Sequence, residues 1–198
     1  MGTLDVRYGQ LMTAMIRAGH HFFEQGDYNL NLIGVRSRDA HSNAFNDALA
    51  VAYKINGRPV CHVFACTTDP GIYWREKPAN VNGTAIVKPG QYPGLWTLGK
   101  HQGKYAALVQ AENITVYRDN DGNGEINTDR NTAYTDTGLF GINCHKAGKQ
   151  SRRVDKWSAG CQVLANECDF NLLMALCEKS AQLWGDRFTY TLLTEDEL

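Results

Sequence analysis

The chain has 198 residues, of which 43% are hydrophobic and 21% are charged, and its formal net charge is −1. A domain of this length buries roughly 70% of its unfolded surface, so it needs no disulfide or zinc staple to fold. The near-neutral charge gives no support to a nucleic acid or an acidic membrane as partner, and no segment approaches the ~20 apolar residues of a membrane span.

The N-terminal part of the chain has the pattern of an amphipathic helix. Apolar side chains recur with a helical period over residues 4–24, and Gly26 provides a stop signal. We therefore expect residues 1–28 to form a helical extension. No linker, repeat or low-complexity stretch interrupts the rest, so residues 1–198 are expected to form a single domain.

Strand patterns follow this helix. Residues 30–35 form a short apolar run typical of a strand. The run 46–55 fits either a strand or a helix. We favour a strand because Asn56-Gly57 is a strong hairpin signal and because residues 59–67 are clearly strand-like.

Further short strands and a second helix complete the predicted fold. Asn166 can cap a helix that runs to about Leu183, with Gly185 as its stop, and a closing strand follows. Many short strands between two terminal helices predict a β-rich α+β fold, built as a mixed β-sandwich or barrel. The additional strands are expected at residues 85–87, 106–110, 115–118, 139–144 and 188–193.

Six cysteines are present, and we expect them to be reduced thiols because the chain does not begin with a signal-peptide pattern. Cys61 and Cys66 should point to opposite faces of one strand and so cannot form a disulfide. Cys168 and Cys177 are predicted to fill the core beside the C-terminal helix. Only Cys161 has the glycine-rich, accessible context, close to basic residues, that is typical of thiols with a low pKa.

Two segments carry the residues of a candidate catalytic site. His145 ends an apolar segment, and Cys161 follows sixteen positions later on a Ser-x-Gly-Cys turn. A base within hydrogen-bond reach is what a thiol needs to act as a nucleophile near neutral pH. Gly160 allows a sharp turn and leaves the neighbouring amides free to face an oxyanion. Asn143 should share the face of His145, so we expect its amide to line the substrate pocket.

Other residues near this pair have two interpretations each. Ser158 could hydrogen-bond the histidine or the substrate, or it could stabilise the turn. Asp155 is a secondary candidate for orienting His145. The turn-rich segment 88–96, followed by His101, could form a wall of the substrate cleft, although a loop packed on the core is the more ordinary interpretation.

The stretch from residue 138 to residue 164 resembles the catalytic segment of the YkuD-type L,D-transpeptidases. These enzymes have a histidine in an apolar-His-x-x strand and a Ser/Thr-His-Gly-Cys nucleophile turn. By this resemblance, Cys161 corresponds to the acyl-accepting thiol and His145 to the base. Gly160 corresponds to the turn glycine and Ser158 to the hydroxyl residue that opens the motif.

The resemblance implies the L,D-transpeptidase catalytic fold and a cysteine-dependent acyl transfer on peptidoglycan stem peptides. His145 would take the proton of Cys161, the sulfur would attack a peptide carbonyl, and the amides of Gly160 and Cys161 would hold the oxyanion. An amine or water would then release the acyl group, giving cross-linking, exchange or hydrolysis. We expect a monomer without cofactor, metal or membrane span. Its localisation stays open, with the cell wall or periplasm expected if the protein is delivered there, because no signal peptide is evident.

Two departures from the family pattern favour an alternative. The histidine that precedes the glycine in the family is Ala159 here, and the arginine two positions after the nucleophile is Val163. The alternative is therefore a catalytically inactive cell-wall-binding or phage structural module on the same fold. A cysteine peptidase with an unrelated substrate would also fit the same cysteine and histidine.

Two metal-binding patterns compete with simpler interpretations. Residues 119–126 resemble the start of a calcium loop, but position twelve is Arg130 instead of a bidentate glutamate, so a hairpin turn is favoured. A zinc site built from cysteines and histidines is disfavoured because neighbouring strand residues face opposite ways and no Cys-x-x-Cys spacing occurs. The zinc candidates are Cys61, His62, Cys66, Cys144 and His145.

Overall fold

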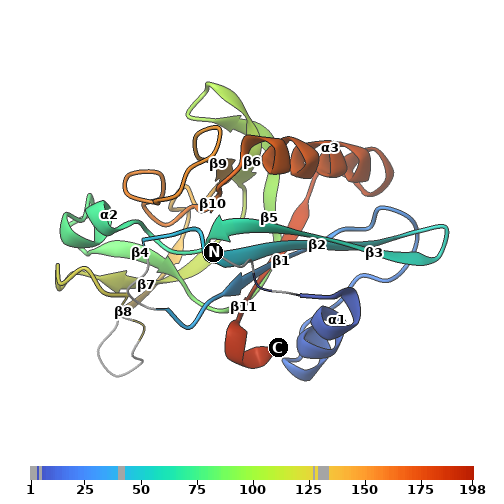
Figure 1. The fold of residues 1–198 in the computed structure, drawn as a ribbon, viewed down its shortest axis with the longest axis horizontal. Helices are drawn as coiled ribbons and strands as arrows, with labels where there is room; N and C mark the ends of the chain where they lie inside the picture. Colours follow the sequence, from blue (N-terminus) through green and yellow to red (C-terminus); the bar gives the residue numbers. More distant parts are fainter. Residues whose placement is uncertain (1–3, 5, 40–42, 127, 129–133) are drawn as a thin grey trace.

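A closed β-barrel forms the centre of the protein (Figure 1). The structure is a computed structural model that describes residues 4, 6–39, 43–126, 128 and 134–198. Among these residues, eight strands close the barrel in the order β1-β11-β5-β6-β9-β10-β3-β2. Their bounds are β1 Asn31–Arg36, β2 Asp47–Ile55, β3 Arg58–Thr67, β5 Gly90–His101, β6 Tyr105–Gln110, β9 Cys144–Lys146, β10 Gln162–Leu164 and β11 Phe188–Thr194.

The barrel is mixed, because β1 pairs with β11 and β9 with β10 in parallel, whereas the other pairs are antiparallel. A second sheet, antiparallel and three-stranded within the described residues, has the order β4-β7-β8. Its strands are β4 (Thr84–Val87), β7 (Ile114–Asp119) and β8 (Tyr134–Gly138). The predicted β-rich α+β fold with N- and C-terminal helices is thus confirmed, and its sheet is a barrel.

Helices α1 (Tyr8–Arg17) and α3 (Glu167–Trp184) lie on opposite sides of the long strands β1 to β3, and the short α2 (Ile72–Glu76) adjoins β4 (Figure 1). The final turn is the 3-10 helix η1 (Glu195–Glu197). None of the described helices has the length and apolar character that crossing a membrane requires.

Two apolar cores explain why β1 and β2 are buried along almost their whole length. Side chains alternate between the faces of a strand. Leu32 therefore points into the barrel core, which α3 completes, whereas Ile33 and Val35 point to a second core under α1. Leu11 and Met15 of α1 are fully buried in that second core. Each fully buried side chain of this size contributes roughly 1.5–3 kcal/mol, so α1 is anchored by its apolar stripe.

The N-terminal helix is shorter than the sequence pattern predicts. It ends at Arg17, with Gly19 at φ 75°, and the amide of His20 donates to the carbonyl of Met15. The prediction of a helical extension over residues 1–28 is therefore wrong beyond Arg17. Gly19 adopts a left-handed conformation that terminates a helix, and it comes earlier than the predicted stop at Gly26.

The C-terminal helix agrees with its sequence signals. The side chain of Asn166 accepts a hydrogen bond from the amide of Cys168 at 2.7 Å, and Gly185 follows the last turn at φ 91°. Cys177 is buried in the barrel core as predicted, whereas Cys168 is exposed, which corrects its predicted role in the core. The six cysteines are free thiols, and Cys61 and Cys66 pack into different cores.

The strand predicted over residues 139–144 does not form. The segment instead bonds to one side chain: Gln110 Oε1 accepts from the amides of Phe140 at 3.0 Å and Ile142 at 2.8 Å, and its Nε2 donates to Gly138 O. Gly141 has φ 74°, which breaks a strand. Strand β9 therefore starts only at Cys144. Segment 88–96, for which the sequence favours a loop, belongs mostly to the long strand β5.

Candidate active site

Parallel pairing of β9 with β10 brings the two candidate catalytic residues to one face of the barrel wall. Val163 is the register partner of His145, and the amide of Gln162 donates to Asn143 O at 2.9 Å, which extends the pairing backwards. Cys161 lies two positions before Val163, so its side chain shares the face of His145. The two residues therefore lie on the same face of adjacent strands, with Cys161 two positions before the register partner of His145.

A buried hydroxyl fixes the turn that carries Cys161. Ser158 is fully buried; its Oγ donates to the carbonyl of Cys161 at 2.8 Å and accepts from the amide of Gly160 at 3.1 Å. From the core side, the buried Gln162 donates to Gly160 O at 3.3 Å and accepts from the hydroxyl of Tyr190 at 2.6 Å. Of its two interpretations, the turn-stabilising one describes Ser158. Because the Gly160 amide is engaged, the expected oxyanion site is reduced to the amide of Cys161.

Gly160 cannot be replaced without strain. Its φ is 130°, and a Cβ atom there would lie 2.7 Å from the carbonyl oxygen of Ala85. We expect Gly160→Ala to lower the free energy of unfolding by about 2–3 kcal/mol. Gly57→Ala is the control, because Gly57 also has a positive φ of 74° but no atom within 4 Å; it should cost only about 1–2 kcal/mol. Chemical denaturation of both variants measures the difference, and equal losses would contradict the close-contact explanation.

His145 is held as a neutral imidazole with a defined tautomer. Its Nδ1 lies 2.9 Å from the carbonyl oxygen of Lys146, an atom that can only accept, so Nδ1 carries the proton and Nε2 keeps its lone pair. Burial lowers the pKa of His145 to about 4; the Lys146 carbonyl opposes this shift and His101 adds to it. The unprotonated Nε2 is the feature that a general base requires.

A second histidine lies against the first. The rings of His101 and His145 stack with centroids 4.0 Å apart and an interplanar angle of 24°. Asn143 fixes His101, because its Nδ2 lies 3.3 Å from His101 Nδ1 and its Oδ1 accepts from the amide of Gln110 at 2.9 Å. The side chain of Asn143 thus lies on the side of His145 as predicted, but both ends of its amide are used within the protein. The amide of Asn143 therefore holds His101 in place through hydrogen bonds made within the protein.

Cys161 does not have the low pKa that its sequence context predicts. Burial raises the pKa of its thiol to about 11, against a smaller lowering by the backbone of Asn143. Its Sγ donates to the carbonyl of Gly141 at 3.4 Å. Basic residues are indeed close in sequence, but Lys146 pairs with Glu167 and does not reach the sulfur. The resting pair is therefore a neutral thiol and a neutral imidazole.

Two cavities flank this pair. A cavity of about 410 Å³ lies on the side of the nucleophile turn and is lined by Trp74, Ala85, Ile142 and Ala159, among others. A second cavity of about 370 Å³ lies on the side of the base. Its lining comprises His101, Gln102, Lys104, Tyr105, His145, Lys156 and Trp157. Ala159, two positions before Cys161, lines the first cavity, and His145 lines the second; among the described lining residues of both cavities, Cys161 itself does not occur.

Several other sequence candidates lie elsewhere. Asp155 accepts from Asn43 Nδ2 at 2.6 Å, so it does not orient the imidazole. In the calcium-like loop, side-chain oxygens of Asp121 and Asn123 accept backbone amides two residues further on, which is turn geometry; Arg130 lies outside the described residues. Within the described part of the chain, no group of three or more histidine, cysteine or acidic side chains could hold a metal ion.

His101 and Tyr105 are the site residues that the sequence pattern did not single out with Cys161 and His145. Only its sequence proximity to an aromatic segment made His101 a candidate for the cleft wall. Antiparallel pairing of β5 with β6 and the single bridge from Leu108 to Cys144 bring both residues to His145. The resulting side-chain contacts, Tyr105 with His145 and His101 with Asn143, join residues 40 and 42 positions apart, so no local signal reveals them.

Comparison of the chain with protein-family models, with curated proteins and with solved structures gave no significant match. Any functional proposal for the chain therefore rests on the geometry of the site and on the motif resemblance.

Proposed function

We propose that the protein is a cysteine-dependent acyl-transfer enzyme that acts on peptidoglycan stem peptides, and that its barrel is a divergent form of the YkuD-type L,D-transpeptidase fold. The observation that carries the proposal is the parallel β9–β10 pairing, which puts Cys161 on the face of a neutral His145, two positions before its register partner. The motif resemblance around residues 138–164 supplies the substrate class. The site of action would be the cell wall or the periplasm.

The reaction begins with a neutral thiol. Cys161 turns from the carbonyl of Gly141 towards Nε2 of His145, which takes the proton as the sulfur attacks the peptide carbonyl. Because the thiol pKa is about 11, little thiolate exists beforehand, so proton transfer and attack are coupled. The negative charge that develops on the carbonyl oxygen is stabilised by the amide of Cys161.

Collapse of the tetrahedral intermediate gives a thioester. His145, now protonated, donates its proton to the departing amine, and the acyl group stays on Cys161. An incoming amine or water then attacks the thioester and regenerates the thiol. Attack by an amine gives cross-linking or exchange, whereas attack by water gives hydrolysis. The cavity at Ala159 is suited to the acyl donor, because it adjoins the nucleophile turn.

The proposal is tested by incubating the protein with purified peptidoglycan fragments and identifying the products by mass spectrometry. Loss of a terminal amino acid, or its exchange for an added amine, is expected with the parent chain and not with Cys161→Ala. Fragments that remain unchanged with the parent protein, in the presence and absence of an added amine, would contradict the proposal.

One observation favours a second candidate, a catalytically inactive module that binds cell-wall material. The thiol donates to Gly141 O, and its pKa is raised, which together describe an unreactive cysteine. The two candidates differ in one measurement. A binding module would retain affinity for peptidoglycan fragments in the Cys161→Ala variant and would release no product from them in the parent form.

A further inference from the structure

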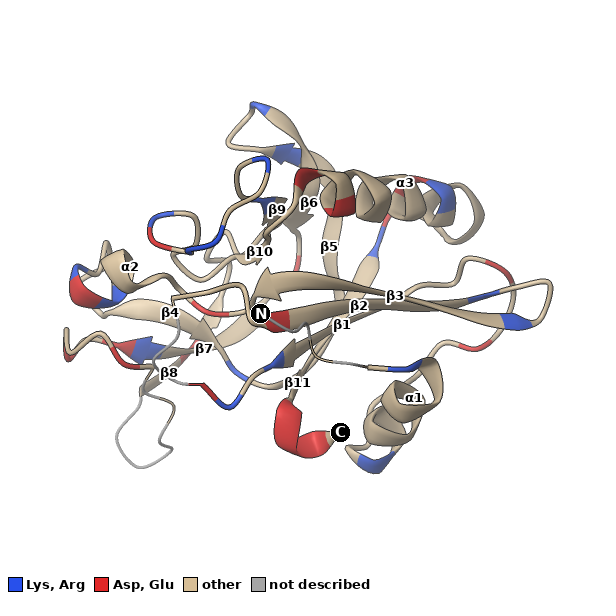
Figure 2. Ribbon diagram, in the orientation of Figure 1, with Lys and Arg blue, Asp and Glu red and all other residues tan. Residues whose placement is uncertain are grey.

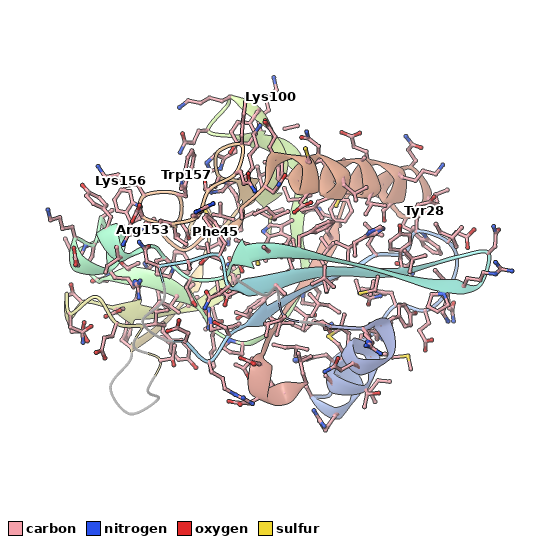
Figure 3. The ribbon with its side chains drawn as sticks, in the orientation of Figure 1. Tyr28, Phe45, Lys100, Arg153, Lys156 and Trp157 are labelled. Atoms are coloured by element: carbon pink, nitrogen blue, oxygen red, sulfur yellow. The ribbon has the colours of Figure 1, made fainter. Side chains whose placement is uncertain are left out.

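The cavity beside His145 has the lining of an anion site. Its described lining combines two imidazoles, two lysines and no carboxylate. Further basic residues lie on the β5–β6 hairpin and on the loop after β9 (Figure 2). Trp157, on that loop (Figure 3), is 46% exposed and lines the cavity with a large aromatic ring. A cation next to an apolar wall suits an anionic group attached to a short carbon skeleton.

The tautomer of His101 follows from a chain of hydrogen bonds. The backbone N–H of Gln110 can only donate, so the Asn143 side-chain atom that it contacts is the oxygen. The other end of the Asn143 side chain is therefore the NH₂ group. This NH₂ group donates to His101 Nδ1, which therefore carries no proton in the neutral ring. The proton of neutral His101 is on Nε2. Burial and the charge of Lys104 lower the pKa of His101, which keeps the ring neutral.

The stacked imidazoles thus have opposite tautomers. His145 has its proton on Nδ1, bonded to the Lys146 carbonyl, and a bare Nε2. His101 has a bare Nδ1, bonded to Asn143, and a proton on Nε2. One ring is equipped to accept a proton and the other to donate a hydrogen bond to a ligand in the same cavity.

Lys104 is the cation of this site. Its Nζ lies 3.3 Å from Gln102 Oε1, at the tip of the hairpin that carries His101, and its charge acts on His101. The Nζ of Lys156, in contrast, lies over the ring of Tyr73 at 4.3 Å, so that lysine is already engaged. Lys104 is exposed and can move towards a ligand at the mouth of the cavity.

We propose that the cavity of His101, Lys104 and Trp157 is a subsite for a carboxylate, the C-terminal carboxylate of the amino acid that departs when Cys161 is acylated. This identity of the ligand rests on the proposed function. The departing amine takes its proton from His145, so the departing amino acid must lie beside that ring. One carbon separates the carboxylate of this amino acid from its amine. The carboxylate accepts a hydrogen bond from His101 Nε2 and is attracted by the positive charge of Lys104.

Binding of N-acetyl-D-alanine to Cys161→Ala protein, followed by NMR titration, tests the subsite without any chemistry. The uncharged N-acetyl-D-alanine amide is the matched ligand. We expect the carboxylate to bind about tenfold more tightly than the amide. His101→Phe keeps an aromatic ring against His145 but removes the donor, and it should abolish this preference. Lys104→Met should reduce it, whereas Lys100→Met, on the same hairpin but outside the lining, should not.

Equal binding of acid and amide, no binding of the acid, or equal effects of Lys104→Met and Lys100→Met would overturn the subsite. These results do not depend on catalysis. A carboxylate preference in a protein that never forms a thioester would leave the subsite intact and remove the proposed function. Acyl transfer without a carboxylate preference would remove the subsite and leave the proposed function intact.

Discussion

Acyl transfer by the Cys161→Ala variant is expected to fall by roughly 1,000-fold or more relative to the parent chain, because the group that forms the thioester is lost. The substitution removes one sulfur atom from a partly buried site whose turn is fixed by Ser158 and Gln162. The fold should therefore be preserved. The rate is measured as release of the terminal amino acid from a purified stem peptide, and the fold by chemical denaturation.

Cys168→Ala is the matched control. Cys168 is an exposed thiol in the first turn of α3, and its removal should leave the rate unchanged. Activity that survives in Cys161→Ala would assign the chemistry to another group. Equal losses in both variants would point to a thiol effect unrelated to the nucleophile turn.

The His145→Gln variant is expected to lose roughly 100- to 10,000-fold in rate near neutral pH, the range that a general base contributes. Its dependence on pH should also change. In the parent, the imidazole stays neutral above a pKa of about 4 and the thiol stays protonated below a pKa of about 11, so the rate of this pair is flat between these values. Without the base, the reaction depends on free thiolate and should rise roughly tenfold for each unit of pH over the neutral range.

The loss of rate in His145→Gln relative to the parent should therefore become smaller as the pH rises. A merely structural defect would not change with pH in this way. His62→Gln is the control, because His62 is a half-buried histidine on β3 that contacts Tyr53. It should reproduce the flat profile of the parent. A His145→Gln profile that runs parallel to the parent at every pH would show that His145 is not the base.

The resting state of the pair distinguishes this site from one with a preformed thiolate. Burial disfavours the charged form of both groups, which raises the pKa of Cys161 and lowers that of His145. A neutral pair does not react readily with adventitious electrophiles. In the proposed mechanism, the thiol reacts when a bound substrate orients it towards His145.

Local sequence signals predicted the elements that depend on local structure. The caps at Asn166 and Gly185 define α3, and the Asn56-Gly57 turn defines the β2–β3 hairpin, with φ values of 50° and 74°. The segment before His145 was mistaken for a strand because its apolar pattern looks like one. Its backbone amides instead donate hydrogen bonds to the side chain of Gln110. This partner is about 30 residues away, and no local sequence pattern indicates it.

For the candidate site, the sequence motif points to two residues but not to the contacts that surround them. The spacing of His145 and Ser-x-Gly-Cys identified the two residues that the β9–β10 pairing aligns. The role of Ser158, the engaged amide of Gly160 and the stacking of His101 depend on tertiary contacts. The pKa of Cys161 was misjudged for the same reason, since burial outweighs the basic residues that are neighbours only in sequence.

The most direct measurement is the intact mass of the protein after brief incubation with a purified stem tetrapeptide, followed by peptide mapping of the product. A thiol-linked acyl group on the peptide that contains Cys161, absent in the Cys161→Ala protein and slow to form in His145→Gln, is the predicted result. A protein whose mass never changes while the peptide is consumed, or an acyl group found on a different residue, would contradict the assignment of Cys161 as the nucleophile.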